Sequence, residues 1–176
     1  MTDFFSTATA SFDDPIALLM ACHERVNHYA QLLVKLADHL PKSGSDEQAR
    51  QAAAAILRYF DIAAPLHHQD EEEDLFPLLA ERGDDALRSL VSVAMLSDHA
   101  ELAGLWQQVR PILLEIEAGR AVELPTDLAE HFARRYPEHA RIEDEQIYPY
   151  AEQLLTRVEL DTIGNHMAER RGAAKR

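Results

Sequence analysis

The sequence predicts an all-α protein: an antiparallel up-down four-helix bundle followed by a short fifth helix. Four long segments repeat apolar residues with a helical period, short polar loops separate them, and no stretch alternates strictly as a strand would. A chain of 176 residues is long enough for one domain with a real core. We expect an N-terminal extension with little regular structure (1–13), the bundle (14–156), and a C-terminal helix and tail (157–176).

The first predicted helix runs from about Pro15 to Leu40. Asp14 followed by proline is a helix-start signal, because the first helical position leaves its amide unpaired in any case. PKSGSD (41–46) is a loop by composition. The second helix, roughly Glu47 to Leu79, begins with an alanine-rich run of high helix propensity.

ERGDD (81–85) ends the second helix, and a third extends from about Ala86 to Glu117. EAGRAVELPTD (117–127) is the next break, and the fourth helix reaches about Leu155. The fifth starts at a capping box, Thr156 to Glu159, and ends at Gly172. Pro65, Pro111 and Pro137 fall inside these helices and predict local bends.

The composition narrows the function classes. A formal charge of -14 argues against binding to nucleic-acid phosphates or anionic membranes. The single Cys22 excludes an internal disulfide and is compatible with a reducing compartment. The start of the chain lacks a basic, apolar signal sequence, and no window is apolar enough for a membrane span. We therefore expect a cytoplasmic protein.

The second and fourth helices contain an internal repeat. ILRYFDIAAPLHHQDEEEDLFP and DLAEHFARRYPEHARIEDEQIYP are related by an offset of 72 residues. This register pairs His67 with His139, Glu71 with Glu143, and Phe76 with Tyr148. The chain therefore resembles two copies of one helical hairpin.

Four histidines and two glutamates are predicted to face the bundle axis. At about 100° per residue, an HxxxE pair stays on one helix face, about 40° and 6 Å apart, and both pairs align with apolar neighbours. His23 and His99 also lie on the apolar faces of their helices. The midpoints of successive histidine pairs fall at residues 45, 83 and 119, inside the three predicted loops. In antiparallel helices this places the four imidazoles in one layer, with the glutamates about one turn away.

The remaining polar residues are interpreted as structural. Within DEEED, Asp70, Glu72 and Asp74 point mostly away from the axis, which is typical of a solvated face. His68 lies about 100° from its neighbour His67. We expect His28, His39 and His131 at the surface, His166 in a structural role, and Cys22 in packing.

Burying four imidazoles and two carboxylates in an apolar layer costs several kcal/mol unless each group finds a partner. Metal cations are the natural partner, and imidazole with carboxylate suits iron, manganese or zinc. Six ligands exceed one tetrahedral zinc and fit two adjacent ions. Two carboxylates leave such a pair positively charged, so we expect a bridging oxide or hydroxide and room for a small molecule.

The ordered pattern His23, HHQDEE with LFP behind it, His99, and EHARIEDEQIYP resembles the hemerythrin-like proteins of the HHE cation-binding type, from about Asp14 to Tyr150. The resemblance implies a bundle enclosing a non-haem di-iron centre that binds or senses dioxygen, nitric oxide, peroxide or iron. The implied ligands are His23, His67, Glu71, His99, His139 and Glu143. Oxygen-carrying members have a second histidine four residues away on the third helix, where this chain has Met95 and Ala103 beside His99.

Their fourth helix also carries an aspartate five residues after its histidine; here that residue is Asp144, whereas Glu143 is the one repeated. The missing histidine favours sensing, redox turnover or a substitute ligand, for which Tyr29, Tyr136 and Glu24 are candidates. Two alternatives remain open: a metal-dependent enzyme (a di-iron peroxidase or oxidase, or a zinc hydrolase), and a regulatory module that the metal stabilises. The oligomeric state and any protein partner are not predicted.

Overall fold

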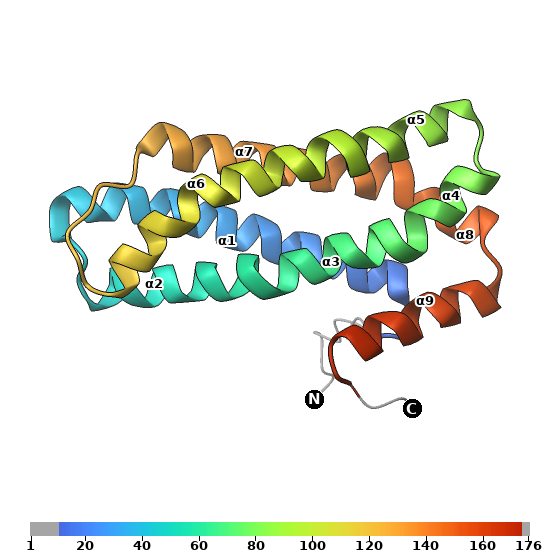
Figure 1. Ribbon diagram of the computed structural model, residues 1–176, viewed down its shortest axis with the longest axis horizontal. Helices are drawn as coiled ribbons and strands as arrows, with labels where there is room; N and C mark the ends of the chain where they lie inside the picture. The colour runs from blue at the N-terminus through green and yellow to red at the C-terminus, as the bar shows by residue number, and fades with distance from the viewer. Residues whose placement is uncertain (1–10, 174–176) are drawn as a thin grey trace, which may run out of the picture.

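The computed structural model describes residues 11–173, and its helices form four long rods and one short helix (Figure 1). Rod 1 is α1 (Pro15–Ser43). Rod 2 joins α2 (Glu47–Arg58), η1 (Tyr59–Ala63), α3 (Ala64–Asp70), η2 (Glu71–Leu75) and α4 (Phe76–Arg82). Rod 3 joins α5 (Asp85–Val93), η3 (Ala94–Asp98) and α6 (His99–Glu117). Rod 4 joins α7 (Thr126–Ile142), η4 (Glu143–Ile147), η5 (Tyr148–Tyr150) and α8 (Ala151–Leu154), and α9 (Arg157–Arg170) follows it.

Side-chain caps set the starts of four helices. Asp14, Asp46 and Asp84 each accept a hydrogen bond from the backbone N–H three residues further on, at the starts of α1, α2 and α5. Thr156 and Glu159 form the predicted capping box of α9. α1 ends at Ser43, three residues beyond the predicted Leu40, and Gly44 follows it with a φ of 64°.

The rods contain short π-helical segments, where the backbone N–H bonds five residues back. Proline has no N–H to donate, and Pro65, Pro77 and Pro149 each follow such a segment by two residues (η1, η2 and η4). By contrast, α6 and α7 continue through Pro111 and Pro137. Each π segment inserts one extra residue into its helix. Side chains beyond the segment therefore point in directions that a uniform step of 100° per residue does not predict.

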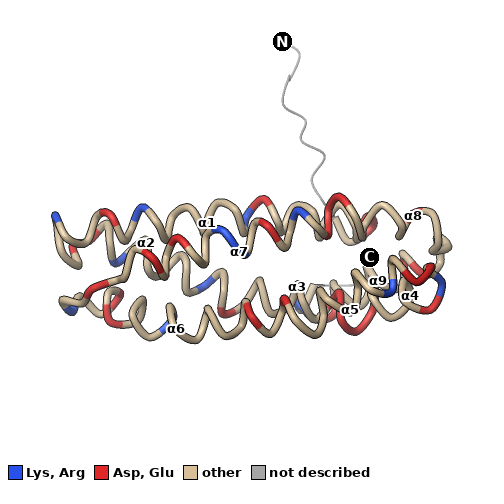
Figure 2. The backbone as a smooth tube through the Cα atoms, turned by 90° about the horizontal axis from the view of Figure 1, so that it is seen from above, with Lys and Arg blue, Asp and Glu red and all other residues tan. Residues whose placement is uncertain are grey.

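The rods pack in an up-down order. α1 packs against α2 and α7, and α6 packs against α2 and α7. The view of Figure 2 shows two layers, one containing α1 and α7 and the other α3, α5 and α6, with acidic residues along all the rods. In the part of the chain that the structure describes, no strand is present, and the predicted fold class is confirmed.

The apolar core is split into two clusters along the bundle. One lies toward the 44–46 loop and includes Leu33, Phe60 and Phe132. The other lies toward α4 and α8 and includes Phe76 and Tyr148. On rod 2 the buried residues between these clusters are His67, Asp70 and Glu71, so the bundle contains a polar layer closed at both ends by apolar side chains.

The predicted division into extension, bundle and C-terminal helix stays a prediction. Residues 1–10 of the extension and 174–176 of the tail lie outside the described residues. Within residues 11–173, no helix is both long and apolar enough to cross a membrane.

Candidate metal centre

The polar layer contains the six side chains that the sequence singles out. They come from all four rods: His23 from rod 1, His67 and Glu71 from rod 2, His99 from rod 3, and His139 and Glu143 from rod 4. All six are buried, with exposed fractions between 0 and 5%. Both glutamates begin a π segment, η2 and η4 respectively, so the two halves of the repeat place them alike.

Four of these side chains form one compact group, named subsite A here. Single ligand atoms of His23, His67, Glu71 and Glu143 all lie within 4.8 Å of one another. The Nε2 atoms of His23 and His67 are 2.9 Å apart, and Glu143 Oε2 lies 3.2 Å from His23 Nε2. Subsite A therefore combines two imidazoles with oxygens of both glutamates.

The other two imidazoles form subsite B, beside the same carboxylates. Glu143 Oε1 lies 3.2 Å from His139 Nε2 and 3.7 Å from His99 Nε2. Glu71 Oε2 lies 3.6 Å from His99 Nε2, and equally 3.6 Å from His67 Nε2. Both glutamates therefore lie between the two pairs of histidines.

Seven buried atoms of these side chains have no hydrogen-bond partner in the described part of the chain. They are His67 Nδ1, Glu71 Oε2, His99 Nε2, His139 Nδ1 and Nε2, and both carboxylate oxygens of Glu143. Buried polar atoms are nearly always paired, because each unpaired one costs about 1–3 kcal/mol. Such a concentration in one layer fits groups whose partner is a cation.

Burial alone would make this layer electrically neutral. It raises the pKa of Glu71 and of Glu143 well above the usual carboxyl range. It lowers the pKa of His67 well below the usual imidazole range and that of His139 to about 3. Neutral imidazoles have a free lone pair for a metal, and a cation would favour ionised carboxylates.

The spacing also suits metal coordination. Two ligand atoms that are each about 2.1 Å from one ion, at a right angle, are separated by about 3.0 Å. The separations of 2.9 Å between His23 and His67 and 3.2 Å from Glu143 to His23 and to His139 match this value. The residues present therefore fit bound cations, and Glu143 has one oxygen toward each subsite.

Carboxylates outside the layer orient two of the imidazoles. His23 Nδ1 donates to Asp144 over 2.8 Å, and His99 Nδ1 donates to Glu72 over 2.5 Å. His139 Nδ1 lies 3.5 Å from Asp98 Oδ2 but makes no hydrogen bond to it. A carboxylate on Nδ1 directs the Nε2 lone pair inward and makes it a stronger ligand. Asp144 and Glu72 are themselves paired by the 72-residue repeat, which is the sequence signal for this role.

The predicted solvated face of DEEED is wrong for Asp70 and Asp74, and Glu72, although half-exposed, binds His99. Asp70 is fully buried and binds Arg170 and Arg171 at 2.9 and 2.7 Å. Asp74 binds Arg170 at 2.5 Å and His166 at 2.7 Å. The helical period showed that these carboxylates point away from the bundle axis. The surface that they face is covered by α9, where the prediction expected water. The acidic run therefore joins the candidate centre to the C-terminal helix.

Sequence reasoning missed two residues at the centre, His68 and Tyr148. The half-buried His68 ring stacks on His99, with centroids 3.9 Å apart and planes 9° apart. A ring nitrogen of His68 also lies within 4.8 Å of ring nitrogens of His99 and His139, so His68 borders subsite B while its ring packs on that of His99. The Tyr148 hydroxyl donates to Glu71 Oε1 over 2.5 Å. The pairing of Tyr148 with Phe76 in the repeat was its only sequence signal.

Of the substitute ligands suggested for the missing histidine, two lie away from the layer, since Tyr29 stacks on Tyr59 and Glu24 is exposed. Tyr136 packs on Phe60 and borders the centre, where its ring stacks on His68 with centroids 6.1 Å apart. His28 is exposed, His131 is half-buried, and half-buried His39 bonds to Asp46. Cys22 is buried, in keeping with the packing role expected for it.

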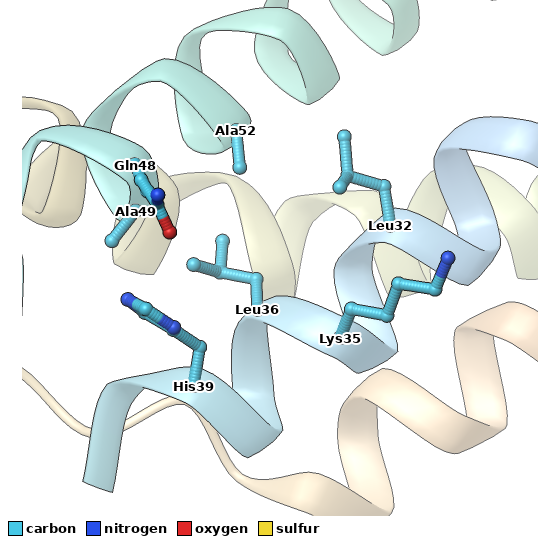
Figure 3. Close-up of a pocket in the computed structure, with 7 residues that line it drawn as sticks. All are labelled: Leu32, Lys35, Leu36, His39, Gln48, Ala49 and Ala52. Carbon is cyan, nitrogen blue, oxygen red and sulfur yellow. The ribbon is translucent and has the colours of Figure 1, made fainter. Parts of the chain in front are cut away.

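A separate cavity of about 190 Å³ lies between α1 and α2 near the 44–46 loop (Figure 3). Figure 3 shows Leu32, Lys35, Leu36 and His39 of α1 facing Gln48, Ala49 and Ala52 of α2. His39 already pairs with Asp46 over 3.0 Å. This cavity contains no group of converging unpaired ligands comparable to the polar layer.

Two comparisons with known proteins bear on the centre. Residues 14–151 match the family model described as the hemerythrin HHE cation binding domain. The chain is also 32% identical over 162 residues to an uncharacterized protein of Haemophilus influenzae (strain ATCC 51907 / DSM 11121 / KW20 / Rd), covering 92% of each chain. The matched region contains all four rods except the end of α8, whereas α9 lies beyond it.

Proposed function

The chain belongs to the family of hemerythrin HHE cation-binding domains, and on this basis we propose that it binds a pair of iron ions and, with them, dioxygen or a related small oxidant. The proposed ligands are His23, His67, Glu71, His99, His139 and Glu143. The observation that supports them is the seven buried, unpaired atoms on five of these side chains, beside which His23 places its Nε2 2.9 Å from His67 Nε2. We also propose a cytoplasmic protein, as the composition predicts.

The residues of the centre have two roles: some would bind the cations, and others would isolate them from water. Four imidazoles supply nitrogen lone pairs, and two carboxylates supply negative charge between subsites A and B. The two apolar clusters exclude water from both ends of the layer. When bound, an iron pair would supply one-electron redox chemistry and open positions for a small molecule.

Metal analysis tests the proposal. Protein expressed in iron-rich medium should contain about two irons per chain and absorb in the near ultraviolet, as imidazole and carboxylate ligands of ferric iron predict. The variant His67→Ala combined with His139→Ala should lose most of this iron. His39→Ala is the matched control, because it removes an imidazole outside the layer, and should keep the wild-type content. Iron-free wild-type protein, or equal loss in the control, would contradict the proposal.

Chelation tests the same ligands through stability. A ligand that binds only the folded state raises the free energy of unfolding, so metal-free protein should melt at a lower temperature. The melting temperature of the His67→Ala, His139→Ala variant should not respond to the chelator. Assaying the same preparations for peroxide turnover distinguishes a binding protein from the enzyme alternative.

A further inference from the structure

The repeat places an aromatic ring beside one histidine in each half of the centre. The ring centroids of Phe76 and His99 are 6.2 Å apart, and the two ring planes are inclined by 22°. Tyr148 lies 5.5 Å from the His23 ring, with planes 7° apart. Both aromatic side chains are almost completely buried. These positions differ chemically in one group, the hydroxyl of Tyr148.

That hydroxyl acts on one glutamate only. It donates to Glu71 Oε1 over 2.5 Å, which leaves Oε2 as the unpaired oxygen of Glu71. Glu143, its partner in the repeat, has both oxygens unpaired, one toward His139 and one toward His23. Two glutamates that are equivalent in sequence therefore offer different numbers of free oxygens.

The hydroxyl also lies at the edge of subsite A. It is 3.5 Å from His23 Nε2, one of the two imidazole nitrogens of that subsite. A phenol carries its proton at neutral pH and is both a donor and an acceptor. The surrounding side chains are apolar or belong to the centre, so the donor is held in place and shielded from water.

We propose that Tyr148 is a positioning residue that makes the two subsites unequal. By occupying Glu71 Oε1, it leaves subsite A with one carboxylate oxygen fewer and a position open for a small anionic ligand. The inference rests on the proposed function, because it concerns the metal-loaded protein.

The test compares iron-loaded wild-type protein with Tyr148→Phe, which deletes only the hydroxyl. The matched control is Tyr59→Phe, which deletes a buried hydroxyl that donates to the backbone carbonyl of Cys22 over 2.8 Å, outside the layer. Iron-57 Mössbauer spectra should show two unequal quadrupole doublets in the wild type and in the control. The doublets should become alike in Tyr148→Phe, since Glu71 regains its second oxygen.

Azide serves as the probe for the open position, followed by its absorption on titration. In Tyr148→Phe the released Glu71 Oε1 should compete with azide for the open position, so azide binding should weaken about tenfold, whereas it should stay unchanged in Tyr59→Phe. Unchanged doublets and azide affinity in Tyr148→Phe would overturn the inference while leaving the proposed function intact.

The wild-type protein alone provides a second test, should Tyr148→Phe fail to fold. A single quadrupole doublet in the iron-loaded wild type, or no binding of azide to it, would overturn the inference. Two unequal doublets together with azide binding would support it. Wild-type protein that contains no iron would overturn this inference together with the proposed function.

Discussion

The two HxxxE segments are alike where they face the centre and different where they face away from it. His67 and Glu71 on rod 2, and His139 and Glu143 on rod 4, are all buried and converge on the same layer. The residue after each glutamate also has a shared role, since Glu72 binds His99 and Asp144 binds His23.

The outward residues of the two segments have different environments. Asp70 is fully buried against Arg170 and Arg171 of α9, whereas Ile142 occupies the equivalent place on rod 4. The exposed ion pair of this part of rod 4 joins Arg141 to Glu145 over 2.7 Å. The repeat therefore keeps the inward pattern, and the outward pattern follows what packs on each rod. The largest expected difference between the halves is in stability.

Replacing the two arginines of α9 should test the difference in stability between the halves most strongly. In the variant Arg170→Ala, Arg171→Ala, Asp70 would remain buried without its partners, which should cost about 3 kcal/mol of unfolding free energy. Arg141→Ala is the matched control, because its pair is exposed and should contribute less than about 1 kcal/mol. Urea unfolding of metal-free protein gives both values. Adding Asp70→Leu should restore most of the loss, and equal effects of the two arginine changes would contradict the comparison.

Variants of the outer carboxylates, Glu72 and Asp144, test whether the two halves of the centre are alike. Glu72→Ala and Asp144→Ala each remove the acceptor of a histidine Nδ1, and loss of such a partner typically lowers metal affinity about 10- to 100-fold. Both variants should therefore lose iron to a competing chelator at lower chelator concentrations than the wild type. Glu145→Ala, which removes an exposed carboxylate from the same π segment as Asp144, should not. A large effect in one half alone would show that the two carboxylates are not equivalent.

The packing of α9 can be tested at Gly164. A Cβ at this position would lie 1.9 Å from the backbone oxygen of Phe12, so Gly164→Ala must displace one of the two segments. We expect a loss of about 1–3 kcal/mol, as is typical when a close-packed contact is overfilled. Thermal unfolding monitored by circular dichroism measures it. An unchanged melting temperature would mean that the contact with Phe12 does not contribute to the attachment of α9.

The smallest effect is expected at Gly104 on α6, and with the opposite sign. A Cβ there would meet no atom within 4 Å, so Gly104→Ala changes little except the conformational freedom of the unfolded chain. The variant should be more stable than the wild type by about 0.5–1 kcal/mol in the same unfolding experiment. A loss of stability would indicate a role for the open space beside Gly104.

The sequence contains most of the information about the layer. The HxxxE spacing keeps a histidine and a glutamate on one helix face, and the loop midpoints place the four histidines at one height. The capping residues indicated where the helices begin. Of the three prolines predicted to bend their helices, only Pro65 follows a π segment, whereas α6 and α7 continue through Pro111 and Pro137. These features are local, so they can be read from one helix at a time.

The sequence by itself therefore determined the bundle, its repeat and the six inward side chains, because helix period and loop position specify both direction and height. Only the tertiary structure decided what the other faces meet: α9 over Asp70, His68 on His99, and the Tyr148 hydroxyl on Glu71. A helical period gives the angle at which a side chain leaves its own axis. The group that it meets there belongs to another segment, and its identity depends on how the helices pack.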